Sequence, residues 1–413
     1  MQIPRRAVLG AAAALPFRPA RAQSERPGAD NVIRIGVLTD LSGPYRDVTG
    51  PTSVACAKLA VDEFTAANPE IRVELISGDH LNKPDTAVGI AREWFDRRGV
   101  DVVTDVGNSA AAIALNSIVR DKDRIQLNTS AGTAELTGRQ CSPNTIHWSY
   151  DTWCLANAVG RGLTRAGRDT WYFIAADYAF GKAIQGDATP IIQAAGGRVV
   201  GSSAYPFPGT TDFSAFLVQA QASRAKVLAF ANAGDDLVNC VRQAQEFGLI
   251  RQGVSLAAMV GSITVVIAVG LPTMQGVTMS ETFYWDLNER TRAFTARMRP
   301  RLPAGVFPNY VHAGAYSGVW HYLKAVKELG VARAKASGRA VIERMKAMPT
   351  DDDVFGPGRI REDGRKIHPA YLLEVKKPGE SRYPGDVMTV RDTIPAEEAF
   401  RPMSAGGCPL VRG

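Results

Sequence analysis

Three short polar loops hold the residues whose chemistry suits a small ligand. The first, TDLSGPYRDVTGP (39–51), follows the strand-like stretch VIRIGVL (32–38) and exposes an aromatic ring and a cation, Tyr45 and Arg46. Its glycines and prolines favour a fixed turn over a mobile loop. We therefore expect both side chains to reach a ligand. The alternative is a solvated connector with a surface Tyr-Arg pair.

The second loop, GNSA (107–110), follows a strand-like stretch and opens a helix. The N-terminus of a helix has unpaired N–H groups and the positive end of the helix dipole, so it suits an anion. Ser109 is also a good capping residue. Asn108 and Ser109 are therefore candidate contacts for an anion, unless they cap the helix and do nothing more.

The third loop, TSAGTAELTG (129–138), repeats that arrangement after the next strand-like stretch. It can offer one hydroxyl and several backbone N–H groups to an acid. The candidate contacts are Ser130, Ala131 and Gly132. An ordinary turn is the alternative for this loop.

Three segments in the second half of the chain also follow strand-like stretches and carry polar or aromatic groups. DYAFG (177–181) offers two rings that can stack on a ligand, NAGDD (232–236) offers polar groups, and ETFYWDL (281–287) offers both. The candidate contacts are Tyr178, Phe180, Asn232, Asp235, Glu281 and Tyr284. The alternative is packing within the fold for the rings and Glu281, and capping of the next helix for Asp235.

Signals for catalysis or metal binding are poor, so we expect neither an enzyme nor a cofactor. The chain has no nucleophile elbow, no dinucleotide fingerprint, no P-loop and no H-E-x-x-H motif. His312 and His321 are nine residues apart on one predicted helix, which places them on opposite faces. His80 is expected on the surface, and His147 and His368 are expected to be structural or exposed.

Strand-like and helix-like segments alternate after residue 31. The strand-like segments of the first series are 32–38, 71–77, 100–106 and 124–128, with helices near 51–67, 84–98 and 109–121. The second series has strands at 170–177, 198–204, 226–232 and 254–260, with helices at 151–166, 179–195, 212–222 and 234–247. Such alternation predicts parallel sheets with right-handed crossovers, and ligands bind at the carboxyl ends of their strands.

The two series predict an α/β protein of two Rossmann-like lobes joined by a three-stranded hinge. The expected extents are 23–150 with 284–355 for the first ligand-binding lobe, 151–283 with 356–395 for the second, and 396–413 for a C-terminal tail. The chain is then expected to cross between the lobes near 148–152, 281–288 and 350–370.

Residues 1–22 have the features of an export signal. Arg5 and Arg6 precede the apolar stretch AVLGAAAALPF (7–17), and ARA (20–22) offers a small-x-small cleavage site. The paired arginines favour the twin-arginine route. The apolar stretch is much shorter than the roughly 20 residues of a membrane span. We therefore expect cleavage after Ala22 and a location in the periplasm.

The formal charge of +7 is partly a property of this signal, which contains four arginines. The rest of the chain has no dense stripe of lysines and arginines with interleaved aromatic residues. Nucleic acid is therefore not an expected partner.

Five cysteines are present, and an oxidising compartment permits a disulfide. Cys141 and Cys408 lie in the proline-containing loops RQCSPN and GGCPLV and form the preferred pair. Cys56, Cys154 and Cys240 fall in helical patterns and are predicted to be small buried residues. Because five is odd, at least one thiol is free or pairs between chains.

Taken together, these segments resemble the periplasmic substrate-binding proteins of ABC importers. The resemblance is to the type I branch, which contains branched-chain amino acid binders and aromatic-acid binders. It is carried, in order, by IGVLTDLSGPY, DVGNSAAAIA, TSAGTAELTG, DYAFGKAIQ, VRQAQEFGL, ETFYWDL and GCPL. It implies that first-lobe loops hold a ligand carboxylate, that the lobes close on it, and that the closed monomer docks on an ABC permease in the inner membrane.

Two departures from the amino-acid binders bear on the ligand. Gly132 stands where those proteins usually carry a threonine, and Ala233-Gly234 where they place a tyrosine, so the cleft is enlarged. An amino acid also needs a buried anion for its ammonium group, for which Asp235 and Glu281 are candidates. We expect an aromatic or bulky carboxylate, with a branched-chain or other amino acid as the alternative. A ligand-sensing subunit of a signalling system is a further alternative, because it has the same fold.

Overall fold

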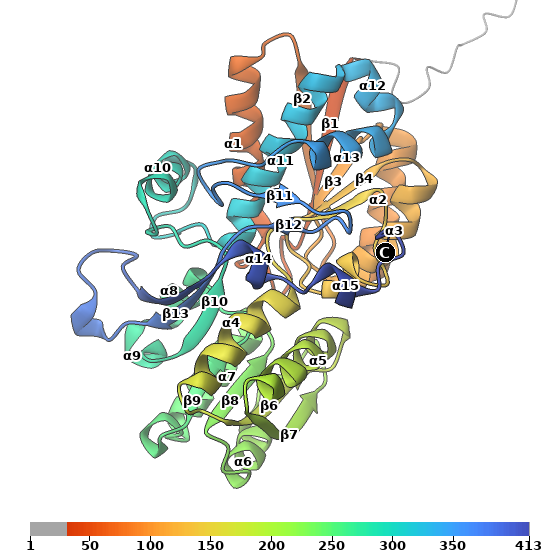
Figure 1. Cartoon of the computed structure of the whole chain (residues 1–413). Helices are drawn as coiled ribbons and strands as arrows, with labels where there is room; N and C mark the ends of the chain where they lie inside the picture. Colours follow the sequence, from red (N-terminus) through yellow and green to blue (C-terminus); the bar gives the residue numbers. More distant parts are fainter. Residues whose placement is uncertain (1–30, 413) are drawn as a thin grey trace, which may run out of the picture.

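The computed structural model describes residues 31–412, and these form two α/β lobes that stand end to end (Figure 1). The predicted export signal, residues 1–22, lies outside the described residues. None of the helices between residues 31 and 412 combines the length and apolar character that a membrane span requires.

The first lobe is built on a five-stranded sheet in the order β2-β1-β3-β4-β5. Its strands are β1 (Val32–Thr39), β2 (Arg72–Asp79), β3 (Val102–Asp105), β4 (Ile125–Asn128) and β5 (Thr145–His147). Its helices are α1 (Gly50–Ala67), α2 (Pro84–Glu93), α3 (Ser109–Asp121), α10 (Glu289–Met298), α11 (Tyr310–Leu329), α12 (Val331–Ala336) and α13 (Gly338–Ala347). All of the strand pairs are parallel, so the carboxyl ends of the strands share one edge.

Alternating side chains bury both faces of this sheet. Ile33 and Ile35 on β1 pack in the cluster that includes α1 and α11. Leu38 on β1 and Val103 on β3 pack in the opposite cluster with α2 and α3. A sheet covered on both faces fixes where its strand ends lie, and the polar loops grow from those ends.

The second lobe is built on a seven-stranded sheet in the order β14-β13-β10-β9-β8-β6-β7. Its strands are β6 (Thr170–Ala176), β7 (Arg198–Tyr205), β8 (Val227–Ala231), β9 (Ser255–Ala258), β10 (Thr278–Glu281), β13 (Ala370–Val375) and β14 (Met388–Ile394). Its helices are α4 (Thr152–Arg165), α5 (Ala179–Ala194), α6 (Ser214–Ala222), α7 (Gly234–Glu246), α8 (Ile263–Val269) and α9 (Leu271–Met274). The two returning strands, β13 and β14, run antiparallel to their neighbours.

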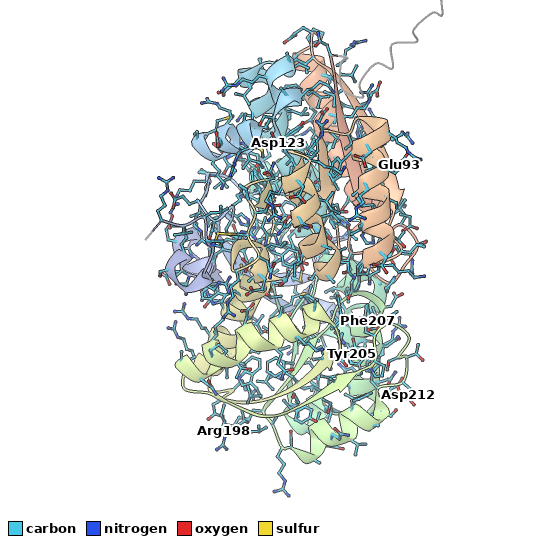
Figure 2. All side chains as sticks on the ribbon, turned by 90° about the vertical axis from the view of Figure 1, so that its right-hand side faces the viewer. Glu93, Asp123, Arg198, Tyr205, Phe207 and Asp212 are labelled. Carbon is cyan, nitrogen blue, oxygen red and sulfur yellow. A yellow bond between two sulfur atoms is a disulfide. The ribbon has the colours of Figure 1, made fainter. Side chains whose placement is uncertain are left out.

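The parallel strands of the second sheet point their carboxyl ends at the first lobe. Figure 2 shows this for β7, since Tyr205 and Phe207 lie at the end that faces the first lobe and Arg198 lies at the far end. The carboxyl edges of the two sheets therefore face each other across the boundary between the lobes.

The short hairpin of β11 (Arg359–Ile360) and β12 (Lys366–Ile367) lies at the joint between the lobes. Its residue Arg365 bridges to His147 at the end of β5, so the hairpin sits beside the first sheet. The sequence prediction, which placed a lobe boundary between residues 355 and 356, had instead assigned this hairpin to the second lobe.

The tail returns to the first lobe after β14. It contains α14 (Ala396–Ala399) and α15 (Met403–Gly406), and α15 lies near α3 in Figure 1. Cys408 forms a disulfide with Cys141 in the first lobe, which is the pair expected from the sequence. The other three cysteines, Cys56, Cys154 and Cys240, are free and buried.

Candidate functional site

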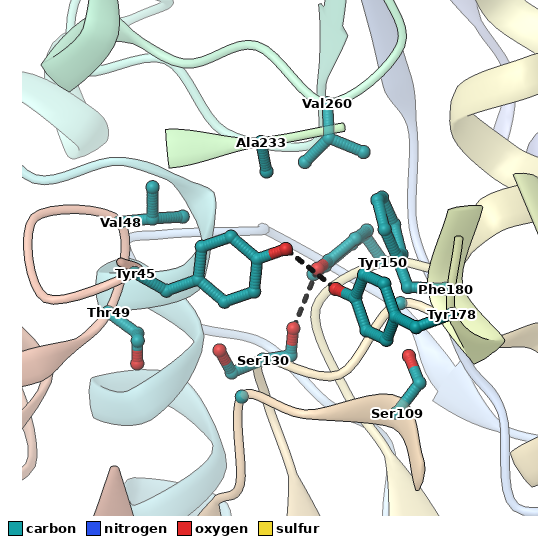
Figure 3. Close-up of a pocket in the computed structure, with 12 residues that line it drawn as sticks. Tyr45, Val48, Thr49, Ser109, Ser130, Tyr150, Tyr178, Phe180, Ala233 and Val260 are labelled. Atoms are coloured by element: carbon teal, nitrogen blue, oxygen red, sulfur yellow. Dashed lines mark hydrogen bonds between the residues drawn. The ribbon is translucent and has the colours of Figure 1, made fainter. Parts of the chain in front are cut away.

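A pocket lies between the carboxyl ends of the two sheets, with about 350 Å³ of empty space when the open solvent at its mouth is included. Figure 3 shows the side chains that point into it from both lobes. The lining residues are Tyr45, Val48, Thr49, Gly107, Ser109, Ser130, Gly132 and Tyr150 from the first lobe, and Tyr178, Phe180, Ala233 and Val260 from the second.

The first lobe contributes a helix N-terminus with a free hydroxyl. Ser109 is the first residue of α3, so its N–H and that of Ala110 have no intrahelical acceptor. The Oγ of Ser109 accepts a hydrogen bond from the N–H of Thr133 at 3.4 Å. The hydroxyl proton of Ser109 is thus left for a ligand, and it lies where the helix dipole favours an anion.

Asn108 caps α3 and does not line the cavity. Its Oδ1 accepts from the N–H of Ala111 at 3.0 Å, and its Nδ2 donates to the Oδ1 of Asn82 at 2.8 Å. Both ends of the amide are therefore used inside the protein, as in the alternative that the sequence left open.

The third loop presents Ser130 and Gly132 to the cavity, while Ala131 is buried behind them. The N–H of Ala131 donates to the side chain of Asn128 at 2.9 Å, and the hydroxyl of Tyr150 donates to the carbonyl of Ser130 at 2.6 Å. A Cβ at Gly132 would lie 3.0 Å from the ring of Phe180. Glycine here lets the second lobe approach the loop closely.

The two lobes touch through an aromatic contact over the cavity. The hydroxyl groups of Tyr45 and Tyr178 are 2.6 Å apart, and the ring of Phe207 stacks on both tyrosines. Burial raises the pKa of both hydroxyls well above the usual value, so both stay protonated. Tyr45 is buried, which corrects the expectation of an exposed ring. Gly234 completes the contact, because a Cβ there would lie 2.5 Å from the carbonyl oxygen of Pro44.

Arg46 does not line the cavity. It lies at the exposed rim, where its Nη1 is 3.3 Å from the Oδ2 of Asp235 in the second lobe. The expected contact between Arg46 and the ligand is therefore replaced by an ion pair between the lobes. Asp235 does not cap α7 either, since that helix has Ala233 at the N-cap position.

Three other candidates point into the second lobe and away from the cavity. Asn232 is buried and bonds to the Sγ of Cys240 at 3.3 Å. Glu281 is fully buried and accepts from the N–H of Ile263 at 3.0 Å, and burial raises its pKa well above the usual value. Tyr284 donates to the carbonyl of Gly385 at 2.9 Å. Their strands end at the expected edge, but these side chains turn into the core.

The histidines are more buried than the sequence suggested. His80 is fully buried and is not on the surface, and burial lowers its pKa to about 4. His147 and His368 are also buried. Across residues 31–412, no group of three or more His, Cys, Asp or Glu side chains could hold a metal ion.

Six of the twelve residues that line the cavity were not predicted from the sequence as ligand contacts. Val48 and Thr49 belong to the first loop and lie directly before the start of α1. The loop folds back over the strand ends. Ala233 and Val260 follow β8 and β9, so the rule that locates ligands at strand ends already included them. Neither was named as a ligand contact because neither carries a polar group, although Ala233 was noted as a position that leaves room in the cleft. Gly107 and Tyr150 complete the set.

The cavity contains polar groups and rings but no charge. Of the twelve residues that line it in the described structure, only the tyrosines carry a titratable group, and they are neutral at pH 7. An anion would therefore be held by hydroxyl and N–H dipoles. A cation would find no carboxylate in contact with it.

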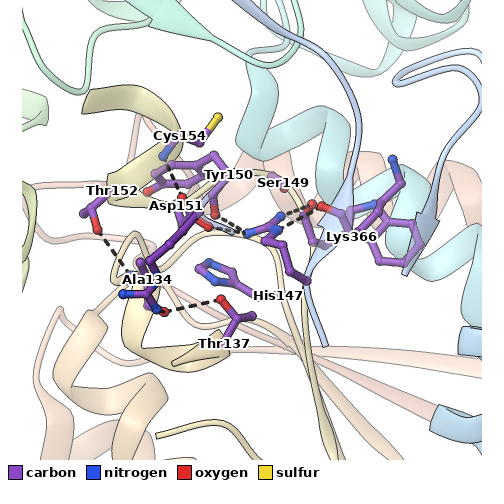
Figure 4. A network of polar contacts seen from close by, with 12 residues as sticks. Ala134, Thr137, His147, Ser149, Tyr150, Asp151, Thr152, Cys154 and Lys366 are labelled. Carbon is purple, nitrogen blue, oxygen red and sulfur yellow. Dashed lines mark hydrogen bonds and ion pairs between the residues drawn. The ribbon is translucent and has the colours of Figure 1, made fainter. Parts of the chain in front are cut away.

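Buried basic side chains occur instead at the joint, within a network of polar contacts (Figure 4). Arg365 is fully buried and donates to the carbonyl oxygens of Trp148, of Tyr150 at 2.7 Å and of Lys366 at 2.8 Å. It also lies 3.6 Å from the carboxylate of Asp151. These contacts engage all three nitrogens of the guanidinium within the protein.

Comparisons with known proteins agree on one architecture. Residues 32–380 match a family model described as periplasmic binding protein. A periplasmic binding protein from Burkholderia mallei is 39% identical, with a TM-score of 0.87 over 92% of this chain and 100% of its own. The ligand-binding protein of a branched-chain amino acid ABC transporter from Burkholderia xenovorans is 35% identical, with a TM-score of 0.81 over 92% of this chain and 99% of its own.

A more distant structure shares only the fold. It is a solute-binding protein of an ABC transporter from Rhodopseudomonas palustris, solved with 3,4-dihydroxybenzoic acid. It is 19% identical, with a TM-score of 0.77 over 89% of this chain and 98% of its own. No curated protein sequence matches the chain.

Proposed function

The chain belongs to the type I periplasmic binding proteins of ABC transporters, and we propose that it captures a small aromatic carboxylate between its lobes. Proteins of this family bind small molecules and deliver them to a membrane permease. Family and solved relatives are binding proteins and not enzymes. The proposal concerns what this member binds, and that it works as a periplasmic monomer.

One observation carries the proposal: the cavity offers donors and rings but no carboxylate. The N-terminus of α3 and the hydroxyl of Ser109 suit the acid group of a ligand. Phe180 and the tyrosines of both lobes suit an aromatic ring. The ammonium group of an amino acid would be buried without a counter-ion, which is costly. Val260 and Ala233 on the opposite wall are apolar.

Binding would be accompanied by closure. Two contacts join the lobes: Tyr45 with Tyr178, which line the cavity, and Arg46 with Asp235, which do not. A ligand that touches both walls binds the closed form better than an open one, and only that difference can drive closure.

Amino acid binding is the second candidate. It is favoured by the 35% identity to a protein described as a branched-chain amino acid transporter component. The two candidates differ in a single chemical group, so a matched pair of ligands separates them.

The experiment is calorimetry with acids that differ only by an ammonium group. The pairs are 3-phenylpropionate against phenylalanine and 4-methylpentanoate against leucine, with benzoate, 4-hydroxybenzoate and 3,4-dihydroxybenzoate as further aromatic acids. We expect the acids without the ammonium group to bind at least about 100-fold more tightly. This difference corresponds to about 2.7 kcal/mol, which is a modest free-energy penalty for burying an unpaired cation. Tighter binding of phenylalanine or leucine would establish the second candidate instead.

A further inference from the structure

A buried carboxyl group lies directly behind the cavity. Asp105 ends β3 and has no exposed surface. Thr49 donates a hydrogen bond to its Oδ2, and Thr129 donates to its Oδ1 at 3.3 Å. The hydroxyl side chains of Thr39, Ser53 and Ser130 surround this carboxyl group and lower its pKa. Two of these residues, Thr49 and Ser130, line the cavity.

The backbone at this point is strained. Asp105 and Val106 have φ angles of 78° and 55°, a region that residues other than glycine seldom adopt and that is unfavourable for a β-branched side chain. Such a conformation costs on the order of 1–3 kcal/mol per residue and is found mainly at binding and catalytic sites. The fold therefore maintains an unfavourable turn at the residue behind the ligand cavity.

The hydroxyls between Asp105 and the cavity can each donate only once. When Thr49 and Ser130 donate to an ionised Asp105, they present only lone pairs to the cavity. A ligand carboxylate has only lone pairs as well. Two acceptor hydroxyls and a second negative charge behind them would therefore oppose the acid that Ser109 attracts.

The titratable groups that face Asp105 supply no compensating cation. They are Cys56 on α1, His80 after β2, Tyr150 after β5, and His312 on α11, whose ring contacts the carbonyl of Thr49 at 3.0 Å. Burial raises the pKa of the thiol and of the phenol, and it lowers the imidazole pKa to about 4 for His80 and about 3 for His312. All four groups are neutral at pH 7.

Asp105 itself is poised to accept a proton. Burial raises the pKa of its carboxyl group, while the hydroxyl hydrogen bonds lower it. An anion placed on the far side of Thr49 and Ser130 would raise it further, because two nearby like charges in a buried site cannot both persist without cost.

We propose that Asp105 takes up one proton from solvent when an aromatic carboxylate enters the cavity. The proton binds a carboxyl oxygen of Asp105, which then donates to a neighbouring hydroxyl and leaves Thr49 and Ser130 free to donate to the ligand. Asp105 acts through these hydroxyls and is a positioning residue. This inference rests on the proposed function, since it requires an anionic ligand.

The first test needs no variant. Calorimetry of the wild-type protein with benzoate, at pH 7 in phosphate and in Tris, measures protons bound per ligand from the difference in buffer ionisation heat. We expect uptake of up to one proton, and an affinity that rises by up to tenfold per unit as the pH falls from 8 to 5.5. Because binding takes up a proton, lower pH must favour it. Equal heats in both buffers with a flat pH profile would overturn the inference.

The second test assigns the proton. Asp105→Asn mimics the neutral carboxyl group, so it should abolish proton uptake, flatten the pH profile and keep benzoate affinity at pH 8 at or above that of the wild type. Asp101→Asn is the matched control, because Asp101 is buried just before the opposite end of β3 and pairs with Lys335. The control should retain proton uptake. Uptake that persists in Asp105→Asn, or is lost in both variants, would refute the assignment.

The two proposals fail in different ways. Benzoate bound without proton uptake leaves the proposed function standing and removes only the role of Asp105. If none of the four aromatic acids (3-phenylpropionate and the three benzoates) binds, both proposals fall together.

Discussion

The two walls of the cavity differ in chemistry. The first-lobe wall carries the hydroxyls of Thr49, Ser109 and Ser130 and the N-terminus of a helix, whereas the second-lobe wall is formed by Phe180, Ala233, Val260 and the ring of Tyr178. A polar wall can orient a ligand while the lobes are apart. An apolar wall gains most when it excludes water. With an aromatic acid as the proposed ligand, the first lobe would select the acid group and the second lobe would cover the ring.

The largest expected effect comes from placing a charge on the apolar wall. Val260→Glu puts a carboxylate opposite the polar wall, where it repels a ligand acid in a site with little water. We expect benzoate affinity to fall at least about 100-fold, or about 2.7 kcal/mol, measured by calorimetry. The variant should gain affinity for phenylalanine, whose ammonium group it can pair.

Val260→Gln is the matched control for size and polarity. It should lose much less benzoate affinity than Val260→Glu. Equal losses in the two variants would show that shape, and not charge, decides what this wall accepts.

The next effect comes from removing the free hydroxyl of the polar wall. Ser109→Ala deletes a donor to an ionised group, which is worth about 1.5–3 kcal/mol, so benzoate should bind about 10–100-fold more weakly. Ser117→Ala, on the exposed side of the same helix α3, should bind like the wild type. A loss of less than threefold in Ser109→Ala would mean that the acid group is held elsewhere.

A smaller effect is expected where the two walls meet. Tyr178→Phe removes the hydroxyl bond to Tyr45 but keeps the ring, so about 0.5–1.5 kcal/mol of closure energy is lost. Benzoate should dissociate about 2–10-fold faster in stopped-flow measurements. Tyr172→Phe also removes a buried tyrosine hydroxyl, one bonded to Ser203 within the second sheet, and should leave the dissociation rate unchanged.

The smallest effect is expected at the rim. Arg46 and Asp235 are both about half exposed, and exposed ion pairs contribute about 0–1 kcal/mol. Arg46→Ala should therefore weaken benzoate binding by at most about fivefold, with the same loss in the Arg46→Ala, Asp235→Ala double variant. A loss of 100-fold in calorimetry would instead place Arg46 in contact with the acid.

The framework of the site could be predicted because strand ends and helix starts leave local signals. The expected helix at 109–121 is α3, so the polar residues at its start were correctly located at a strand end. Ser130 and Gly132 follow from the same rule applied to the next strand. These positions depend on alternating pattern and turn chemistry, which the sequence carries directly.

The direction of side chains beyond those ends could not be predicted. Glu281 ends β10 at the proper edge, yet its carboxylate turns back to bond with the start of α8. Arg46 is in the expected loop, but the approach of the second lobe supplies Asp235 as its partner. Both outcomes depend on contacts between segments far apart in the chain. Asp105 was overlooked because it looks like the end of an ordinary strand and its role depends on an unusual φ angle.

The joint between the lobes limits how they can move apart. The chain segments that cross there are bonded to each other side by side: Thr282 donates to the carbonyl of Ser149 at 2.9 Å, and the Nε2 of His368 lies 3.3 Å from the carbonyl oxygen of Trp148. Three crossing segments that are hydrogen-bonded to one another can bend about a single axis but resist twisting. The second lobe would therefore rotate about a single hinge axis. A single spectroscopic distance, measured between one label on each lobe on the side away from the joint, would then record the whole motion.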